Sequence, residues 1–278
     1  NFLQVVQKVA GKVLGIDPAS NVTAIANCRG IPTVTGFFNE DTASSISADF
    51  GKVDLLVARH MFAHNTMPAE MIKGVRNCLA PGGTFLVENA YAVETLLHGE
   101  FDQVYHEHMF YYSASSMSRL MKNHGFDLYD IYFSNVHGGS ASFFICKEGE
   151  RAISAEVIKC LDKERDLFTN KDTFLKFKSG VCELRAHVNS FVEQCDKNGE
   201  SIAIYSVPNK LFTFLSFTEF PLNKIEFMVD TSLEKIGKFY PNSNIKIFSE
   251  SELQDRQCDV FLIGAWNYKR EIVNKSPK

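Results

Sequence analysis

The chain has 278 residues, 45% of them apolar, which is enough to bury a substantial core and to form two domains. Its formal charge of −4 gives no basic surface that would favour nucleic acid or an acidic membrane. The seven cysteines are scattered without a C-x-x-C pair, and no apolar run reaches membrane-spanning length. We therefore expect a cytoplasmic protein with free thiols that binds neither nucleic acid nor membrane.

Short apolar runs alternate with helical patterns along the first half of the chain. We expect strands over residues 12–17, 33–38, 53–58 and 84–88, and helices over residues 2–9, 19–29 and 67–79. A further helix is expected over residues 115–124, followed by an antiparallel pair of edge strands over residues 127–133 and 141–147. Strands and helices that alternate at this spacing predict an α/β fold with a doubly wound parallel sheet.

The second half begins with a charged helical region and ends in a second strand–helix series. Apolar residues three and four apart, from Phe174 to Cys195, predict a seam for another helix, either within the chain or from a second subunit. Strands are expected over residues 201–205, 225–230, 245–248 and 258–264. We thus expect one domain over residues 1–150, a helical linker over 151–198 and a smaller α/β domain over 199–278.

A polar cluster stands out in the segment between the two halves. Tyr105, His106, Glu107 and His108 are consecutive and have aromatic neighbours on both sides. Burying such groups is costly, so chemistry explains them better than structure does. In an extended strand the two histidines would share one face and Glu107 the other, which does not suit a shared metal ion. The cluster favours general acid–base chemistry, and no metal site is expected.

Two further positions carry weaker signals. Asp17 ends a predicted strand, where an acid can accept hydrogen bonds from both hydroxyls of a ribose, as in dinucleotide enzymes and in methyltransferases that use S-adenosylmethionine (SAM). His60 and His64 have the spacing of a zinc-protease motif but lack its glutamate, which argues against that class. His64 is interpreted either as a cleft residue beside Tyr105 and His108 or as a loop histidine bonded to backbone.

The motifs together resemble the SAM-dependent sugar C-methyltransferases, which act at C3 of nucleotide-linked 4-keto-deoxysugars. The resemblance rests on F-D-Q-V-Y-H-E-H at 101–108, the helix ending in H-G-F at 124–126, H-G-G-S at 137–140 and A-W-N-Y at 265–268. It spans essentially the whole chain. It implies a class I SAM-methyltransferase domain with a Rossmann-like sheet, followed by a smaller Rossmann-like domain that contributes to the substrate site.

The resemblance also implies roles for individual residues. His108 is the base, while Tyr105 and His64 bind the carbonyl oxygen or the sugar hydroxyls, and His106 has no role. Glu107 orients an imidazole or binds a sugar hydroxyl. The residues assigned to SAM are Asp17, Pro18, Phe37, Phe38, Ala58, Arg59 and His60. The residues assigned to the nucleotide sugar are Glu88, Asn89, His137, Gly138 and Lys210, with a tight turn between edge strands as the alternative for His137 and Gly138.

The departures from the family pattern carry expectations of their own. The family's zinc module and glycine-rich SAM loop are expected upstream of residue 1, so the chain is interpreted as truncated at both ends and residues 1–278 are expected to bind SAM weakly or not at all. Zinc belongs only to that module. The turn at residues 205–211 lacks glycine, which hinders close approach of a phosphate. A nucleotide-dependent oxidoreductase and a non-catalytic scaffold that dimerises through the helical seam are the alternatives.

Overall fold

The structure is a computed structural model that describes residues 2–275. The chain forms two compact units, each assembled from three stretches of sequence. The first unit comprises Asn1–Asn89, Ala114–Tyr132 and Ser142–Leu161, and the second comprises Ala90–Ser113, Phe133–Ala141 and Asp162–Lys278. The Tyr105–His108 stretch therefore groups with the C-terminal residues. The domain division expected from the sequence, at residues 150 and 198, stays a prediction.

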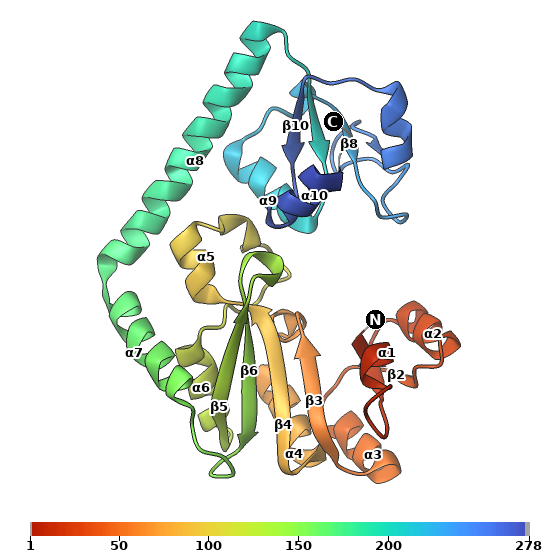
Figure 1. Ribbon diagram of the computed structural model, residues 1–278, viewed down its shortest axis with the longest axis vertical. Coiled ribbons are helices and arrows are strands. Elements are labelled where there is room, and N and C mark those ends of the chain that lie inside the picture. The colour runs from red at the N-terminus through yellow and green to blue at the C-terminus, as the bar shows by residue number, and fades with distance from the viewer. Residues whose placement is uncertain (1, 276–278) are drawn as a thin grey trace. The chain divides into compact units, whose positions relative to one another are not determined.

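The first unit contains two groups of strands with helices against them (Figure 1). Its strands are β1 (Gly15–Asp17), β2 (Thr33–Thr35), β3 (Val53–Arg59), β4 (Leu79–Ala90), β5 (Phe126–Ser134) and β6 (Ser140–Lys147), the last three extending into the second unit. Its helices are α1 (Phe2–Val6), α2 (Ser20–Cys28), α3 (Glu40–Phe50), the short 3-10 turn η1 (Phe62–His64), α4 (Pro68–Cys78), α6 (Ala114–Lys122) and the start of α7 (Ala155–Thr169). The α/β class predicted from the sequence is confirmed.

The sheet of the first unit is divided. Strands β1 and β2 pair in parallel with Asp17 opposite Thr35, while β3, β4, β6 and β5 form a separate four-stranded sheet in that order. Strands β3 and β4 are parallel, and their register sets Arg59 opposite Glu88. Among the described residues no strand joins β1 to β3. The single doubly wound sheet expected from the sequence is therefore present as two parts.

The apolar pattern of β4 explains where the core of the first unit lies. Alternate residues of this strand are buried, and Phe85 and Val87 are fully enclosed. The ring of Phe85 packs edge-on against that of Phe62, with 6.0 Å between centroids. A side-chain period of two buries one face of a strand. The core thus fixes the direction of β3 and β4, whose carboxyl ends carry Arg59 and Glu88.

The second unit has its own parallel sheet, in the order β10-β7-β8-β9. The strands are β7 (Ile202–Tyr205), β8 (Ile225–Val229), β9 (Ile247–Phe248) and β10 (Val260–Ile263). The helices are α5 (Ala92–His98), α8 (Lys171–Asn198), α9 (Asn209–Thr218) and α10 (Lys269–Lys275), with 3-10 turns η2 (Phe101–Gln103), η3 (Val136–Gly138), η4 (Leu222–Lys224), η5 (Glu250–Asp255) and η6 (Trp266–Tyr268). This arrangement agrees with the second strand–helix series predicted from the sequence.

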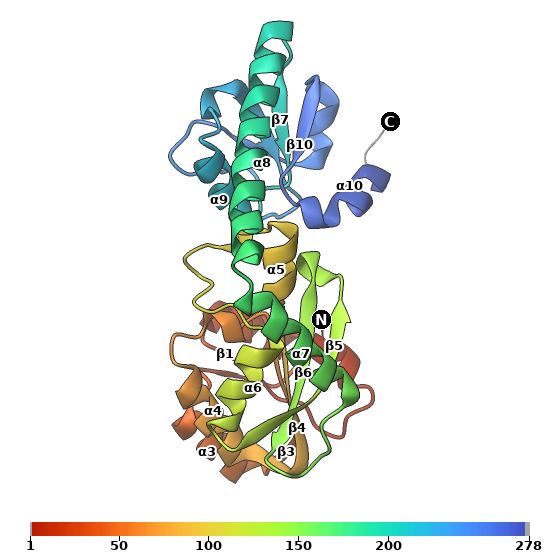
Figure 2. The same cartoon turned by 90° about the vertical axis from the view of Figure 1, so that its left-hand side faces the viewer.

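Helix α8 runs beside α5 and α9, as both views show (Figures 1 and 2). Cys195 of the predicted seam is buried in the core of the second unit beside Val192, and Val188 of the seam packs against that core. Phe174 and Phe191 are 48% and 39% exposed. The C-terminal part of the seam therefore packs within the chain, and dimerisation through the remainder stays a prediction. No helix within residues 2–275 is both long and apolar enough to cross a bilayer.

The turn between β7 and α9 contains a residue with positive φ but has no glycine in its own sequence. Ser206 adopts φ +72°, a conformation that L-residues rarely take. Gly264, at the end of β10, faces it: a Cβ added there would lie 2.1 Å from the carbonyl oxygen of Ser206. The glycine that this turn requires therefore lies on the neighbouring strand.

Candidate active site

The Tyr105–His108 stretch forms a turn that follows η2, and not an extended strand. All three residues of η2 (Phe101, Asp102 and Gln103) are buried. The backbone N–H of His108 donates to the carbonyl of Tyr105 at 3.0 Å, which closes the turn. The strand alternation that would set His106 and His108 on one face does not apply. Tyr105 and His108 instead come together, while the side chain of His106 is 89% exposed and its ring lies edge-on to that of Tyr105, with 6.4 Å between centroids.

The imidazole of His108 is held at both nitrogens. Nδ1 lies 2.8 Å from the carbonyl oxygen of Gln103, and Nε2 lies 3.1 Å from the hydroxyl oxygen of Tyr105. A carbonyl only accepts hydrogen bonds, so Nδ1 carries the proton and donates it. In the neutral ring Nε2 then bears the lone pair, and the Tyr105 hydroxyl donates to it. The geometry therefore identifies Nε2 as the basic atom of His108.

Tyr105 contributes a hydroxyl that stays protonated near neutral pH. Burial raises the pKa of Tyr105, and the nearby negative charge of Glu107 raises it further. Its ring lies beside that of His108, with 4.3 Å between centroids. A neutral phenol next to a basic nitrogen can donate a hydrogen bond to an oxygen that becomes negative.

Glu107 lies on the outer side of the turn. Its carboxylate accepts a long hydrogen bond of 3.5 Å from Nδ2 of Asn209, and its side chain is 44% exposed. Glu107 was expected either to orient an imidazole or to bind a sugar hydroxyl. The imidazole of His108 is oriented by the backbone carbonyl of Gln103 instead. The carboxylate of Glu107 is accessible for a hydroxyl group.

The other residues expected at the nucleotide sugar in the second unit surround η2. The carbonyl of His137 accepts a hydrogen bond of 2.9 Å from Nε2 of Gln103. A Cβ added to Gly138 would come within 2.7 Å of both Glu100 Oε1 and Trp266 Cη2. Nζ of Lys210 lies 3.9 Å from Asp102 Oδ2 and 4.1 Å from the centroid of the Trp266 ring.

Three residues of this surround have no role in the sequence-based hypothesis. Asp102 and Gln103 fall inside the F-D-Q-V-Y motif and Trp266 inside A-W-N-Y, so the motifs contained them without indicating what they do. Nε1 of Trp266 donates to Oδ2 of Asp102 at 2.6 Å, across 164 positions of sequence. Gln103 contacts His108 through its backbone carbonyl. Every residue has such a carbonyl, so the type of side chain at position 103 could not have indicated this contact.

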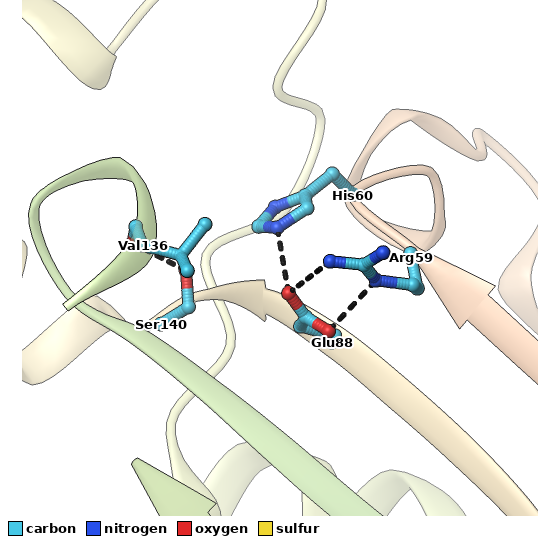
Figure 3. A network of polar contacts seen from close by, with 5 residues as sticks. All are labelled: Arg59, His60, Glu88, Val136 and Ser140. Atoms are coloured by element: carbon cyan, nitrogen blue, oxygen red, sulfur yellow. Dashed lines mark hydrogen bonds and ion pairs between the residues drawn. The ribbon is translucent and has the colours of Figure 1, made fainter. Parts of the chain in front are cut away.

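In the first unit, three expected binding residues bind one another (Figure 3). Nε of Arg59 lies 2.9 Å from Glu88 Oε2, and Nη2 of Arg59 and Nε2 of His60 each lie 3.1 Å from Oε1. Burial alone would raise the pKa of Glu88, but the hydrogen bonds and charge of Arg59, with the contribution of His60, outweigh it and lower that pKa. Burial lowers the pKa of His60, which keeps its ring neutral near pH 7. Figure 3 also shows the Ser140 hydroxyl donating to the carbonyl of Val136, 2.8 Å away, within the second unit.

The remaining candidates for SAM follow the strands of the first unit. Asp17 ends β1, and its Oδ1 accepts a hydrogen bond of 2.8 Å from the N–H of Ala19, after Pro18. Phe37 is 73% exposed and its neighbour Phe38 is half-buried, while Ala58 is buried in β3. A half-buried carboxylate at a strand end can accept the two hydrogen bonds that paired ribose hydroxyls donate.

Asn89 and His64 differ in what surrounds them. Asn89 is 2% exposed, and neither polar atom of its amide has a hydrogen-bond partner among the described residues. Buried amides are normally satisfied, so an unpaired one marks a place where a polar ligand fits. His64 ends η1, with its N–H donating to the carbonyl of Met61 at 3.0 Å. Within residues 2–275 no three His, Cys, Asp or Glu side chains converge as metal ligands.

Comparison with known proteins gives consistent matches in both halves. Residues 1–131 match a family described as a methyltransferase domain, and residues 135–278 match one described as the C-methyltransferase C-terminal domain. C-methyltransferase NovU of Streptomyces niveus is 32% identical over 274 residues, a match that covers 98% of this chain and 65% of NovU. The chain thus spans less than two thirds of the length of that relative.

Two solved structures are similar at low identity. A SAM-dependent methyltransferase from Anabaena variabilis ATCC 29413 is 12% identical, with a TM-score of 0.42 over 53% of this chain and 72% of that one. A DhpI–SAM–HEP complex is 15% identical, with a TM-score of 0.40 over 52% of this chain and 72% of that one.

Proposed function

The chain belongs to the C-methyltransferase family, whose C-terminal domain matches more than half of it, and we propose that its protein methylates a carbon next to a keto group. The methyl donor in this proposal is SAM, and the acceptor is a nucleotide-linked deoxysugar. The observation that carries the proposal is the arrangement of His108, whose basic Nε2 lies beside the neutral hydroxyl of Tyr105. The family match favours methyl transfer over the alternatives of an oxidoreductase and a scaffold.

Proton removal is the first requirement of this chemistry. A carbon next to a ketone becomes a nucleophile when it loses a proton, and the electron pair of the broken C–H bond moves into an enolate. Nε2 of His108 accepts that proton. Because Nδ1 already donates to Gln103, the imidazolium that results keeps this bond and needs no reorientation.

Stabilising the enolate oxygen is the second requirement. The Tyr105 hydroxyl bonds to Nε2 of His108, so its proton is available to a new acceptor once Nε2 becomes protonated. We assign the enolate oxygen to Tyr105, with His64 and Glu107 binding sugar hydroxyls. A preorganised donor at a developing oxyanion commonly contributes about two to three orders of magnitude in rate.

The methyl donor must be held so that the methyl group faces the carbanion. SAM, when bound, supplies an electrophilic methyl group on a sulfonium. Asp17 would hold its ribose hydroxyls, and Phe37 is exposed for contact with an adenine ring. Arg59 and His60 have their polar groups engaged by Glu88, so they contribute by shaping the end of β3. The transfer itself depends on alignment of the two carbons.

The nucleotide sugar is assigned to residues with unused or partly used polar groups. Asn89 has an unsatisfied amide among the described residues, which suits a sugar hydroxyl. Gly138 has φ +97° and lets Glu100 and Trp266 lie close to its backbone, so its assigned contribution is to shape this side of the sugar site. The ammonium of Lys210 lies against Asp102 and Trp266, so its charge reaches a phosphate only in competition with Asp102. A cytoplasmic location and a homodimer remain part of this proposal.

The decisive experiment measures exchange of the proton next to the ketone, separately from transfer of the methyl group. The protein that contains this chain is incubated with a keto-deoxysugar nucleotide in heavy water, and deuterium incorporation next to the ketone is measured without SAM. His108→Asn is expected to lose both this exchange and methylation, while its affinity for SAM is unchanged. His106→Asn is the matched control, because its side chain is 89% exposed and no role in the chemistry is assigned to it, so both activities should persist. Retained exchange in His108→Asn would remove His108 as the base.

A further inference from the structure

We propose that Trp266 and Asp102 are positioning residues for His108, acting through the η2 turn to fix which nitrogen of the imidazole is basic. This inference rests on the proposed role of His108 as the base. It concerns residues of the second unit only. The three elements involved are η2, the turn that follows it and η6, which carries Trp266.

The η2 turn is anchored by a different contact at each of its residues. The ring of Phe101 packs against Phe217 of α9, with 4.7 Å between centroids. Oδ2 of Asp102 accepts the indole N–H of Trp266 at 2.6 Å. Nε2 of Gln103 donates to the carbonyl of His137 at 2.9 Å. Three anchors in three consecutive residues leave the turn little freedom to rotate.

The Asp102–Trp266 bond is the strongest of these anchors on chemical grounds. The Asp102 side chain is 6% exposed, and an ionised carboxylate so deep in protein requires donors and counter-charge. The indole N–H supplies the donor. Lys210 supplies the charge, with its Nζ 3.9 Å from Asp102 Oδ2 and against the face of the same indole ring. Removal of the indole N–H would leave a buried carboxylate with one fewer partner.

The anchored turn sets the state of His108 because its last carbonyl is the acceptor for Nδ1. An unrestrained neutral imidazole exchanges its proton between the two nitrogens, and a hydrogen bond to one of them selects the tautomer. The selecting bond here is the 2.8 Å contact between Nδ1 of His108 and the carbonyl of Gln103. Asp102, the residue before Gln103, makes the hydrogen bond to Trp266 that holds this carbonyl in place.

Of the four residues between Gln103 and His108, Tyr105 contacts His108 itself and the other three are exposed. Val104 is 51% exposed, and the side chains of His106 and Glu107 are 89% and 44% exposed. Residues with so much solvent contact have little packing of their own. The orientation of His108 therefore depends on the buried η2 turn, and through it on a residue 158 positions further along the chain.

The test uses Trp266→Phe, which retains a ring and removes the N–H. The protein is labelled with ¹⁵N-histidine, and the tautomer of His108 is read from its two ring-nitrogen shifts in the absence of substrate and SAM. We expect the wild type to be in the Nδ1–H form and the variant to be a mixture. For the full protein we expect kcat to fall on the order of ten- to a hundredfold, with KM changed less than twofold.

Tyr205→Phe is the matched control, because it also removes an aromatic donor from a carboxylate, that of Glu250, in the same unit. It should leave both the tautomer and kcat unchanged. Asp102→Asn weakens the Trp266 bond from its other end and should shift the tautomer in the same direction. A folded Trp266→Phe or Asp102→Asn variant whose His108 tautomer is unchanged overturns the inference. If instead wild-type protein catalyses no proton exchange, the proposed function fails while the tautomer result stands.

Discussion

The hydroxyl of Tyr105 and Nε2 of His108 share one hydrogen bond of 3.1 Å, and the proposed mechanism gives each group a separate task. In that proposal the nitrogen takes a proton from carbon, and the hydroxyl turns to the oxygen that gains charge. A base that is hydrogen-bonded to its own oxyanion donor needs no further side chain to begin enolisation.

Tyr105→Phe separates these two tasks. The variant keeps the ring and loses the donor, so we expect kcat for methylation to fall by about 10² while SAM affinity is retained. Steady-state kinetics with measured SAM binding check this. Because burial raises the pKa of Tyr105, the wild-type rate should not decline from tyrosine ionisation between pH 7 and the ordinary tyrosine pKa near 10. A Tyr105→Phe variant of wild-type rate would assign the oxyanion to another group.

Gly138→Ala should destabilise the second unit. A methyl group at this position meets Glu100 and Trp266 at 2.7 Å and must also adopt φ +97°. Strain and overpacking each cost about 1 to 3 kcal/mol, so we expect a loss of roughly 2 to 6 kcal/mol in the free energy of unfolding. Urea denaturation measures it.

Gly149→Ala is the control for Gly138→Ala, because its φ of +78° is similar but no atom lies within 4 Å of the added methyl group. The control isolates the cost of backbone strain. Equal losses in the two variants would show that the contact with Glu100 and Trp266 is not tight.

Glu88→Gln should make the first unit less sensitive to acid. The folded-state pKa of Glu88 lies below its ordinary value of 4.5, so its ionised form stabilises the fold above that pH and the benefit is lost as pH falls through the folded value. We expect the variant to be less stable by about 1 to 3 kcal/mol at pH 7, with the difference shrinking below pH 4.5.

Denaturant unfolding at a series of pH values checks the Glu88→Gln prediction. Glu70→Gln is the control, since its carboxylate is 39% exposed and pairs with Lys73, three residues along the same helix. A Glu88→Gln difference that stays constant with pH would contradict the ionic account.

Asn89→Leu is expected to separate stability from activity. Its amide is buried without a partner among the described residues, and an unsatisfied buried polar group costs about 1 to 3 kcal/mol. The free energy of unfolding should therefore hold or rise, while kcat/KM falls about tenfold or more. In contrast, Asn27→Ala should destabilise, because the Asn27 side chain makes two hydrogen bonds of 2.9 Å with the backbone of Thr33. Equal loss of stability in both variants would give Asn89 a structural role.

Periodicity in the sequence predicted many elements of this chain, although helices α3 and α5 were not predicted. The helix expected over residues 115–124 is α6 at Ala114–Lys122, and the strands of the second unit lie within a residue or two of their predicted bounds. These elements obey a local rule, since apolar side chains recur with the period of the structure they form. The division of the first sheet was not predicted, because strand pairing is a non-local property.

Residue chemistry singled out the candidate site, but the connections within it were not predicted. His108 and Tyr105 were chosen by residue type, whereas the alternation that separated His108 from Glu107 failed because the segment is a turn. Arg59 and Glu88 were assigned to different ligands, and the parallel register of β3 and β4 instead pairs them. The Gln103 carbonyl and the Asp102–Trp266 bond involve a backbone atom and a contact 164 residues apart, which no local pattern reports.

The divided sheet has a practical consequence for handling the chain. Within the described residues β1 and β3 each present an open backbone edge, and Leu55 of β3 is 49% exposed there. Such edges readily pair with strands of other molecules. Residues 1–278 in isolation are therefore expected to self-associate with rising concentration, and light scattering should detect this well before activity assays do.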